Sequence, residues 1–567
     1  MSKKIVIVGG VAGGASAAAR ARRLDETAKI TMFERGPHVS FSNCSLPYYL
    51  GGLIDDADDL VMMSPEQFEK QYNIDAQVNS EVVAVDPAAK IVSVKQTQTG
   101  EMKQVNYDEL VLSPGAKPVA PACIKGINRD NVFTVRNVVD IKKIHTFLEV
   151  NHATDVAIVG GGFIGLEMCE NLAHTGRHIS LIEAADHVMG TIDEDFAQLV
   201  HKELYDHGVD VIVKEGLAEI TADKAILGSG REVPAQAVIV AIGVAPETEL
   251  ATKIGCKLGL TGGIAVDQHY QTSIPNIYAV GDAIEITHML TRKKTRLALA
   301  FPAQMEARDA VDHMYGRPIQ NQGVIGSAAI HIFDLNVAST GLTEHQCQKE
   351  GIDFRSAMVI PKSRVGLMPD ATPLYLKLVF AYPSGEVLGA QALGKSDVDK
   401  QIDIVATMIT MHGKISDLTH LEVCYSPWFS TAKNAVNMAA LVAENILNGE
   451  YEQVPLTEVR KLVEKKAFII DAREPDEYAA GHIINAVNIP LSEFRQRLDE
   501  IPTDQPVYIH CLSSQRSYNM VRALGNLGYH NVYNIVGSFL GLCEYEYFQD
   551  QVTERQPIVT NYRFDLL

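Results

Sequence analysis

Residues 156–165 read Val-Ala-Ile-Val-Gly-Gly-Gly-Phe-Ile-Gly, an apolar strand that runs into a glycine-rich turn. The glycines Gly160, Gly162 and Gly165 permit a tight turn, close approach of a pyrophosphate and close packing of helix on strand. The next apolar strand ends at Glu183, about 20 residues further on, where a carboxylate can hydrogen-bond a ribose hydroxyl. The stretch predicts a βαβ unit that binds a dinucleotide, and a tight connection without a ligand is the alternative.

The same pattern opens the chain. Lys4–Val8 is an apolar strand, residues 9–14 read Gly-Gly-Val-Ala-Gly-Gly, and Glu34 closes the following strand. Val11 stands where the ideal fingerprint has its second glycine. Two such turns on one chain predict one cofactor that is held permanently and one that comes and goes. The second site favours NADH over NADPH, because Glu183 is followed by two alanines rather than by an arginine for a 2′-phosphate.

A third nucleotide signal follows the apolar run 277–280. Gly281 and Asp282 come directly after this run, at the predicted start of a helix. A carboxylate in that place can hold the ribityl chain of a flavin.

Length and charge limit the class of protein. At 567 residues the chain is expected to hold about three to five domains. A net charge of -20 argues against nucleic acid or an anionic membrane surface as the main partner. No stretch reaches the roughly 20 apolar residues of a membrane helix, and the eight scattered cysteines contain no CxxC pair. We therefore expect a cytoplasmic protein with no metal site.

Two cysteines lie in stretches suited to sulfur chemistry. Cys44 lies in Ser-Phe-Ser-Asn-Cys-Ser-Leu-Pro, residues 40–47, and Pro47 is compatible with a helix that begins there and lowers the thiol pKa. Cys511 follows the predicted strand 507–510 and opens a loop that leads into a helix from Ser517. Inward-pointing amides of such a loop would stabilise a thiolate or persulfide. An inert core cysteine is the alternative for Cys44.

Residues 1 to about 440 resemble the pyridine nucleotide-disulfide oxidoreductase family. The resemblance rests on both fingerprints with their glutamates, on residues 110–116 and 241–243, and on the Gly281-Asp282 pair. It implies FAD and NADH as cofactors, with NADPH as the alternative to NADH. The cofactor-binding residues expected on this basis are Gly9, Val11, Ala12, Gly13, Gly14, Glu34, Arg35, Asn43, Ser113, Gly115, Gly160, Gly162, Phe163, Ile164, Gly165, Glu183, Gly243, Gly281, Asp282 and Ala300.

Within that family the chain resembles the single-cysteine branch, which includes CoA-disulfide reductase, NADH oxidase and peroxidase, since Cys44 has no second cysteine nearby. The CoA-disulfide reductase group implies a homodimer in which Tyr425 is a proton donor to the leaving thiolate of the partner subunit's site. The CoA contacts it implies are Ser16, Arg20, Arg23, Ser40, Asn43 and Lys433. A solvated basic helix face is the alternative for the arginines, and an ordinary packed tyrosine for Tyr425. Leu367-Met368 stands where many members have two tyrosines, which favours a persulfide or polysulfide over CoA disulfide.

The C-terminal part resembles a rhodanese domain. The resemblance rests on three blocks, 467–474, 477–483 and 486–490, and on the loop from Cys511 to Arg516. It implies that Cys511 carries sulfane sulfur and that Arg516 closes the loop and attracts an anionic substrate. Ser514 stands where glycine is common, so an altered loop geometry is expected. A catalytically inactive scaffold is the alternative.

These features predict an α/β protein with two Rossmann-like nucleotide-binding domains, an α+β dimerisation domain and a C-terminal rhodanese domain. The expected ranges are 1–115 with 245–322 for FAD, 116–244 for NAD(P)H, 323–445 for dimerisation, 446–456 for a linker and 457–567 for the rhodanese domain. The predicted activity is NADH-dependent reduction of CoA persulfide, polysulfide or CoA disulfide. An NADH oxidase or peroxidase whose Cys44 passes through sulfenic acid, and a redox sensor with a non-catalytic rhodanese module, are the alternatives.

Overall fold

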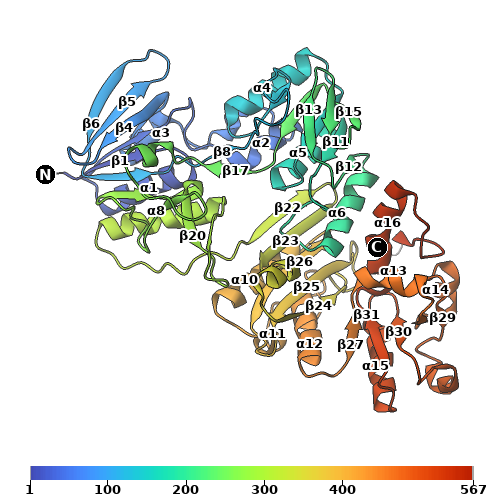
Figure 1. Cartoon of the computed structure of the whole chain (residues 1–567). Coiled ribbons are helices and arrows are strands. Elements are labelled where there is room, and N and C mark those ends of the chain that lie inside the picture. The colour runs from blue at the N-terminus through green and yellow to red at the C-terminus, as the bar shows by residue number, and fades with distance from the viewer. Residues whose placement is uncertain (1, 565–567) are drawn as a thin grey trace. The chain divides into compact units, whose positions relative to one another are not determined.

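The computed structural model describes residues 2–564 as an α/β chain, which confirms the predicted fold class (Figure 1). Its contacts form two compact units. The first contains the residues up to 184 together with 215–324, and the second contains 185–214 together with the residues from 325 onward. The finer division into four domains stays a prediction.

A parallel five-stranded sheet forms the first core of unit one. The strand order is β19-β7-β1-β2-β3, with bounds Ile277–Ala279, Glu109–Leu112, Lys4–Val8, Lys29–Phe33 and Asp75–Gln77. Helix α1 (Ala12–Leu24) joins β1 to β2, as the first fingerprint predicts, and packs against α8 (Ala300–Met314). The core is apolar because Ile5, Ile7 and Leu110 are completely buried.

A second parallel sheet of unit one contains β11, β10, β16 and β9 in that order. Their bounds are His178–Ile182, Asp155–Val159, Ala237–Val240 and Val132–Phe133, and α5 (Phe163–Ala173) joins β10 to β11. Smaller sheets contain β4 (Ser80–Asp86), β5 (Ile91–Gln96) and β6 (Met102–Asn106); β8 (Ala116–Pro118) and β17 (Val244–Pro246); β13 (Leu217–Ile220), β14 (Lys224–Leu227) and β15 (Glu232–Pro234); and β18 (Ile264–Ala265), β20 (Ile284–Thr287) and β21 (Lys294–Thr295). Further helices are α2 (Leu46–Leu50), α3 (Pro65–Tyr72), α4 (Val138–Val150) and α7 (Glu249–Lys253).

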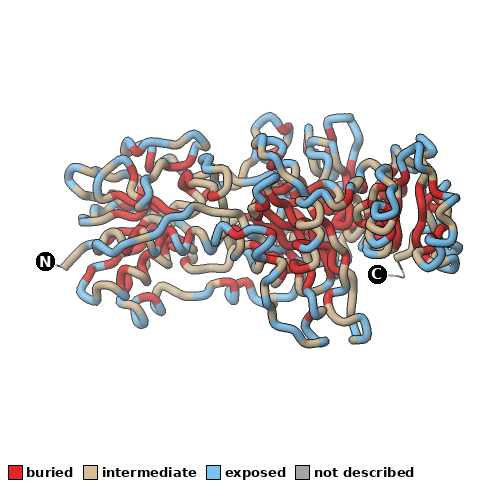
Figure 2. The backbone as a smooth tube through the Cα atoms, turned by 90° about the horizontal axis from the view of Figure 1, so that it is seen from below, coloured by how far each residue is buried: buried red, intermediate tan, exposed pale blue. Residues whose placement is uncertain are grey.

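Unit two contains an antiparallel sheet of order β22-β23-β26-β25-β24. The bounds are Ala328–Ile332, Leu335–Gly341, Val387–Gly394, Leu374–Ala381 and Phe354–Val359. Strands β25 and β26 are almost entirely buried (Figure 2), since α10 (Val398–Thr410) and α12 (Ala435–Leu447) pack on this sheet. The other helices here are α6 (Glu194–Asp206), α9 (Glu344–Glu350) and α11 (Ile415–Thr419).

The C-terminal sheet of unit two is parallel, in the order β27-β31-β30-β28-β29. The bounds are Glu452–Val454, Val532–Ile535, Val507–His510, Phe468–Asp471 and Val487–Asn488, with helices α13 (Leu456–Glu464), α14 (Pro475–Ala480), α15 (Gln515–Asn526) and α16 (Ser538–Thr553). The predicted linker 446–456 differs from this arrangement. Its residues 452–454 form β27, which pairs with β31 of the C-terminal sheet, while its first two residues end α12.

Two predicted helix starts also differ. Asp282 lies in a 3-10 turn, Gly281–Ala283, that runs into strand β20 rather than into an α-helix. Helix α15 begins at Gln515, two residues before the predicted Ser517, because Ser514 already adopts the conformation that ends the loop.

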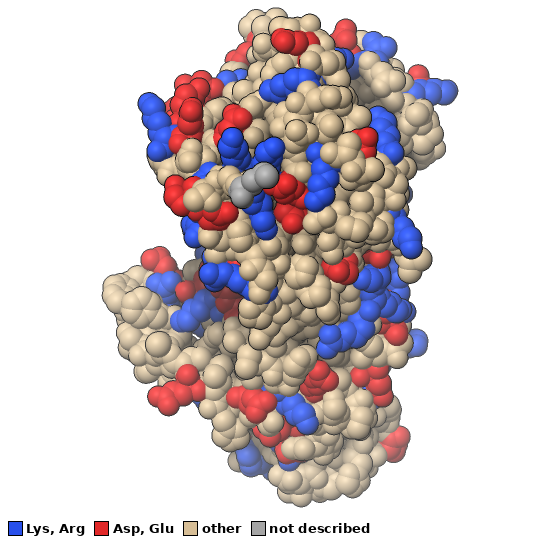
Figure 3. Space-filling model, turned by 90° about the vertical axis from the view of Figure 1, so that its left-hand side faces the viewer, with Lys and Arg blue, Asp and Glu red and all other residues tan. Residues whose placement is uncertain are grey.

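The surface carries charged side chains of both signs. On the face drawn in Figure 3, acidic and basic side chains are interspersed. Among residues 2–564, the helices are all too short or too polar to cross a bilayer.

Candidate functional site

The first fingerprint lines a cavity of unit one. The predicted cofactor contacts that lie outside residues 160–243 belong to this cavity. All of them line it except Gly14 and Ala300. Ala303, one turn further along α8 than Ala300, lines it instead. Asn43 lines this cavity, and Cys44 is the next residue in the sequence.

The residues of this cavity fit FAD. Gly9 has φ +96°, and a Cβ there would lie 2.0 Å from the Ser113 carbonyl oxygen. A Cβ on Gly14 would lie 1.8 Å from the Gly9 carbonyl oxygen, so Gly14 permits close packing of α1 rather than contact with the cofactor. The first turn of α1 carries no acidic side chain, which leaves its N–H groups suited to phosphate. Asn43 Oδ1 is buried without a hydrogen-bond partner in the described chain, as expected for an atom that faces a ligand.

Two carboxylates of the cavity are held in place. Glu34 accepts hydrogen bonds from the Gly10 N–H at 3.0 Å and the Gly36 N–H at 2.8 Å. Asp282 lies 3.7 Å from Arg136 Nη1, and burial raises its pKa although Arg136 opposes the shift. Arg136 was missed from the sequence because no motif surrounds it.

The second fingerprint has the geometry of a dinucleotide turn. Gly160 has φ +108°, and a Cβ on Gly165 would lie 1.9 Å from the Gly160 carbonyl oxygen. A Cβ on Gly162 would meet nothing within 4 Å, so space is open where a pyrophosphate would approach. The Glu183 carboxylate accepts the Gly161 N–H at 2.6 Å. The other predicted contacts lie beside this turn: Phe163 and Ile164 begin α5, and Gly243 follows β16 with φ +110°.

Cys44 lies in a 3-10 turn, Asn43–Ser45, that continues into α2. The predicted helix is therefore present, and Pro47 occupies its first turn. The sequence predicted a lowered pKa for Cys44, and this prediction is wrong for the protein without its ligands. Cys44 is an exposed residue, but desolvation by the protein around its thiol raises the pKa of Cys44, and the charges of Glu167 and Asp282 raise it further. Cys44 is a free cysteine.

A groove next to α1 collects most of the predicted CoA contacts. Ser16, Arg20, Arg23 and Ser40 all line it. Arg22 does not, because it is buried and its guanidinium donates to main-chain carbonyls such as those of Tyr72 and Ala28. Apolar side chains such as Met63, Phe68 and Met305 line the groove together with these arginines, and CoA binding there stays a prediction.

The charge in this groove is partly compensated. Arg20 Nε donates to Asp312 Oδ1 at 2.9 Å. Arg308, which the sequence analysis missed, also lines the groove and lies 3.8 Å from Asp312. Arg23 is exposed and lines the groove as a third cation.

Three predicted residues lie elsewhere. Asn43 lines the cofactor cavity rather than the groove. Tyr425 and Lys433 belong to unit two, in a segment without helix or strand. Tyr425 is 50% exposed, and the neighbouring Trp428 and Phe429 are exposed as well. Tyr425 is therefore not a packed core tyrosine.

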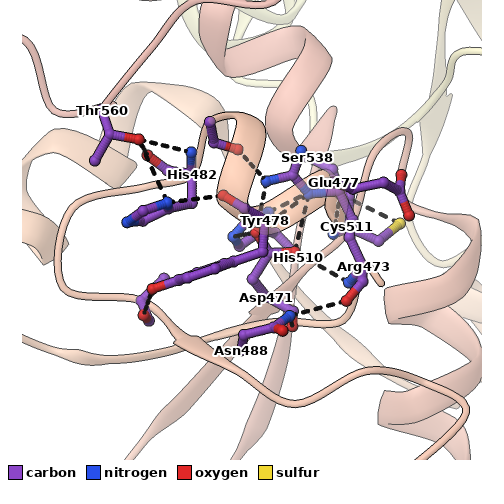
Figure 4. A network of polar contacts seen from close by, with 12 residues as sticks. Asp471, Arg473, Glu477, Tyr478, His482, Asn488, His510, Cys511, Ser538 and Thr560 are labelled. Atoms are coloured by element: carbon purple, nitrogen blue, oxygen red, sulfur yellow. Dashed lines mark hydrogen bonds and ion pairs between the residues drawn. The ribbon is translucent and has the colours of Figure 1, made fainter. Parts of the chain in front are cut away.

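Cys511 directly follows strand β30 of the C-terminal sheet (Figure 4). This cysteine is only 1% exposed. The Cys511 N–H donates to Ser538 Oγ at 3.1 Å. The hydroxyls of Ser517 and Ser538 lie 3.6 Å and 4.0 Å from the Cys511 sulfur. Ser514 has φ +74°, so it keeps the left-handed conformation that glycine favours and its hydroxyl bonds the Ile535 carbonyl. Neither serine at 517 nor 538 was marked by a motif.

A buried charge network lies behind Cys511 (Figure 4). Arg473 donates to Asp471 through Nε at 3.0 Å and Nη2 at 2.6 Å, and both side chains are almost fully buried. His510 Nε2 lies 3.5 Å from Asp471. Burial lowers the pKa of His510, and the neighbouring Asp471 carboxylate opposes this shift. Burial alone would raise the pKa of Asp471, but its polar partners outweigh that and hold it below its usual value.

Arg516 lies in the first turn of α15, and its guanidinium is not free. Its Nη1 and Nη2 donate to the two carboxylate oxygens of Glu477 at 2.5 Å and 2.7 Å. The expected attraction of an anion by Arg516 is thereby compensated. Glu477 belongs to a block quoted for the rhodanese resemblance, but nothing in the sequence marked it as the partner of Arg516.

Comparison with known proteins identifies the families of most of the chain. A family model described as pyridine nucleotide-disulphide oxidoreductase matches residues 3–307, its dimerisation-domain model matches 327–436, and a rhodanese-like domain model matches 455–544. A coenzyme A disulfide reductase of Staphylococcus haemolyticus is 31% identical over 78% of this chain and 100% of that protein.

Two solved structures extend over the C-terminal part as well. Reduced Bacillus anthracis CoADR-RHD is 40% identical, with a TM-score of 0.93 over 96% of this chain and 99% of that one. An NAD-dependent persulfide reductase from A. fulgidus is 34% identical, with a TM-score of 0.90 over 95% of this chain and 99% of that one.

Proposed function

The chain belongs to the pyridine nucleotide-disulphide oxidoreductase family, and on that premise we propose that it reduces CoA persulfide, polysulfide or CoA disulfide through Cys44 while Cys511 transfers sulfane sulfur. FAD and NAD(P)H are the cofactors of this family, and the relatives that cover nearly the whole chain are a CoADR-RHD and a persulfide reductase. They favour this function over an oxidase, a peroxidase or a sensor.

The observation that carries the proposal is the free thiol of Cys44, which has no disulfide partner and directly follows Asn43, a residue that lines the FAD cavity. Because no second thiol of the chain is paired with it, the substrate has to supply the other sulfur. The Cys44 thiolate attacks the inner sulfur of a persulfide R–S–SH, expels HS⁻ and forms Cys44–S–S–R. When bound, FAD supplies the two electrons, taken from NADH, that cleave this mixed disulfide to two thiolates.

The chain's own residues have distinct tasks in this scheme. The exposed Tyr425 donates a proton to the leaving thiolate of the partner subunit's site. Arg23 and Arg308 hold the phosphates of CoA in the groove beside α1. The matched dimerisation model supports a homodimer. A cytoplasmic location is part of the proposal and is supported by eight cysteines that are all free.

Stopped-flow oxidation of NADH with CoA persulfide, CoA disulfide, polysulfide and peroxide tests the proposal. Turnover of peroxide or oxygen that is orders of magnitude faster than turnover of the sulfur substrates would contradict it. Cys44→Ser should abolish persulfide reduction but leave flavin reduction by NADH intact. Cys511→Ser should spare small disulfides and impair sulfur transfer, and unchanged transfer would make the rhodanese part a scaffold.

A further inference from the structure

Two serines close to Cys511 have the backbone conformation that glycine favours. Ser514 has φ +74° and Ser538 has φ +50°, in the left-handed region where a Cβ is strained. Ser538 is also completely buried at the start of α16. Glycine would adopt either conformation without this strain, and residues held in such conformations concentrate at functional sites. Serine adds a hydroxyl at both positions, so the contacts of these hydroxyls decide what the two residues do.

The two hydroxyls are joined to each other and to the Cys511 loop. Ser538 Oγ accepts the Cys511 N–H at 3.1 Å (Figure 4) and lies 3.1 Å from Ser514 Oγ. The Ile535 carbonyl oxygen lies 3.2 Å from Ser514 Oγ and 3.3 Å from Ser538 Oγ. The Cys511 sulfur lies 4.0 Å from Ser538 Oγ. The single hydroxyl proton of Ser538 therefore has three acceptors within reach: the other hydroxyl, the carbonyl oxygen and the sulfur.

We propose that Ser538 is a positioning residue for Cys511, whose hydroxyl turns from the Ile535 carbonyl to the sulfur when the sulfur is a thiolate. A neutral thiol is a weak acceptor, whereas a hydrogen bond to the charged form stabilises that form. Only the hydroxyl hydrogen has to move, because Ser538 Oγ continues to accept the Cys511 N–H. Ser514 then donates to the Ile535 carbonyl, so this buried acceptor keeps a partner. The inference rests on the proposed role of Cys511 as a reactive sulfur and names the group that responds to its charge.

The charged side chains of this region are already engaged with one another. Arg473 pairs with the Asp471 carboxylate, and Arg516 donates both terminal nitrogens to Glu477. Burial lowers the pKa of His510, the residue before Cys511, although Asp471 opposes the shift. The hydroxyl of Ser538 can reorient toward a thiolate without breaking either ion pair, which makes it a low-cost source of stabilisation.

Ser538→Gly and Ser538→Ala, made in the full-length FAD-containing protein, separate the hydroxyl from the backbone strain. Both remove the hydroxyl, but only glycine also relieves the left-handed conformation. Thiolate formation is followed by ultraviolet absorbance, as the difference from the same protein carrying Cys511→Ser, so that the other cysteines and the flavin cancel. At a pH where the wild-type thiol is less than half ionised, both variants should show about a tenfold lower thiolate fraction. Ser538→Gly should nevertheless melt at a higher temperature than Ser538→Ala.

Two further variants serve as controls for strain and for the second hydroxyl. Lys466 is exposed and left-handed, with φ +54°, so Lys466→Gly relieves the same kind of strain and should leave the Cys511 titration unchanged. Ser514→Gly keeps the direct donor but removes its replacement at the Ile535 carbonyl, so its effect should be smaller, about threefold. Equal titrations of the wild type and both Ser538 variants would overturn the proposal. A shift with alanine but not with glycine would also overturn it, because strain rather than the hydroxyl would then govern ionisation.

Loading with inorganic polysulfide separates this inference from the proposed function. The Cys511 thiolate takes up one sulfur atom and the polysulfide dianion leaves one sulfur shorter, so atoms, electrons and charge balance. Mass spectrometry of single turnovers at the same pH should show loading about tenfold slower in both Ser538 variants, in proportion to their thiolate fraction. Unchanged loading rates despite a lower thiolate fraction would refute a role of Ser538 in the reaction. If polysulfide fails to load wild-type Cys511, the proposed function fails, while the titration still decides whether Ser538 stabilises the thiolate.

Discussion

Asp471→Asn should lower the free energy of unfolding of the C-terminal sheet and leave the stability of unit one unchanged. The substitution preserves size and one acceptor oxygen but leaves the Arg473 guanidinium buried without a counter-charge. Removing one partner of a buried ion pair costs about 3–5 kcal/mol. The lower end is expected here, because Arg473 still donates to the Gly481 carbonyl and lies 4.0 Å from the centre of the Phe539 ring.

Alkylation of buried cysteines measures this cost locally. Cys511 and Cys543 are each 1% exposed, so a thiol reagent reaches them only when the surrounding structure opens. A loss of about 3 kcal/mol should raise their labelling rates about 150-fold. Cys169, which is completely buried in unit one, serves as the internal control and should keep its rate. An increase of less than about tenfold at Cys511 would refute the reasoning.

The double variant and the pH dependence test the charge specifically. Combining Asp471→Asn with Arg473→Met removes both charges, so its cost should be less than the sum of the two single costs. Since the folded pKa of Asp471 is lowered, its contribution to stability is fully present above the ordinary value of 3.8 and is lost as the pH falls through the folded pKa. The single variant should lack this acid-dependent loss.

Three further substitutions test the nucleotide-binding unit. Glu167→Gln removes a charge that raises the pKa of Cys44, so the pH midpoint of Cys44 alkylation should move to lower pH; an unchanged or higher midpoint would contradict the assignment. Gly165→Ala places a Cβ 1.9 Å from a backbone oxygen and should cost about 1–3 kcal/mol in thermal unfolding. Gly162→Ala meets no neighbour and should preserve the melting temperature but raise KM for NADH, and equal stability losses at both glycines would disprove the distinction.

Local patterns were sufficient for two strands that lead into candidate sites. The predicted β1 and β30 match the structure residue for residue, because each is a short, mainly apolar run that ends at a marked turn or loop, Gly9 after β1 and Cys511 after β30. Asp282 was placed correctly at the cavity, but its 3-10 turn was not foreseen, since a single turn has no periodicity to read. Strand β27 was read as a linker because it is three residues long, and only its pairing with β31 makes it a strand.

Partners across the fold could not be read from the sequence. Arg136 and Asp282 are far apart in the chain, as are Glu477 and Arg516, and each pair meets only after the strands are assembled. The raised pKa of Cys44 is the clearest case. The helix start that lowers a thiol pKa was visible in residues 40–47, whereas the opposing charge of Glu167 lies on another helix.

The two reactive cysteines differ in what the chain itself provides for a thiolate. Around Cys511 the hydroxyls of Ser517 and Ser538 are already within hydrogen-bonding reach of the sulfur. Around Cys44 the charges of Glu167 and Asp282 oppose ionisation, so stabilisation of that thiolate has to come from bound cofactor, substrate or the partner subunit. In the proposed function, sulfur acceptance at Cys511 thus draws on groups of the folded C-terminal sheet and its helices, whereas reduction at Cys44 depends on an assembled site.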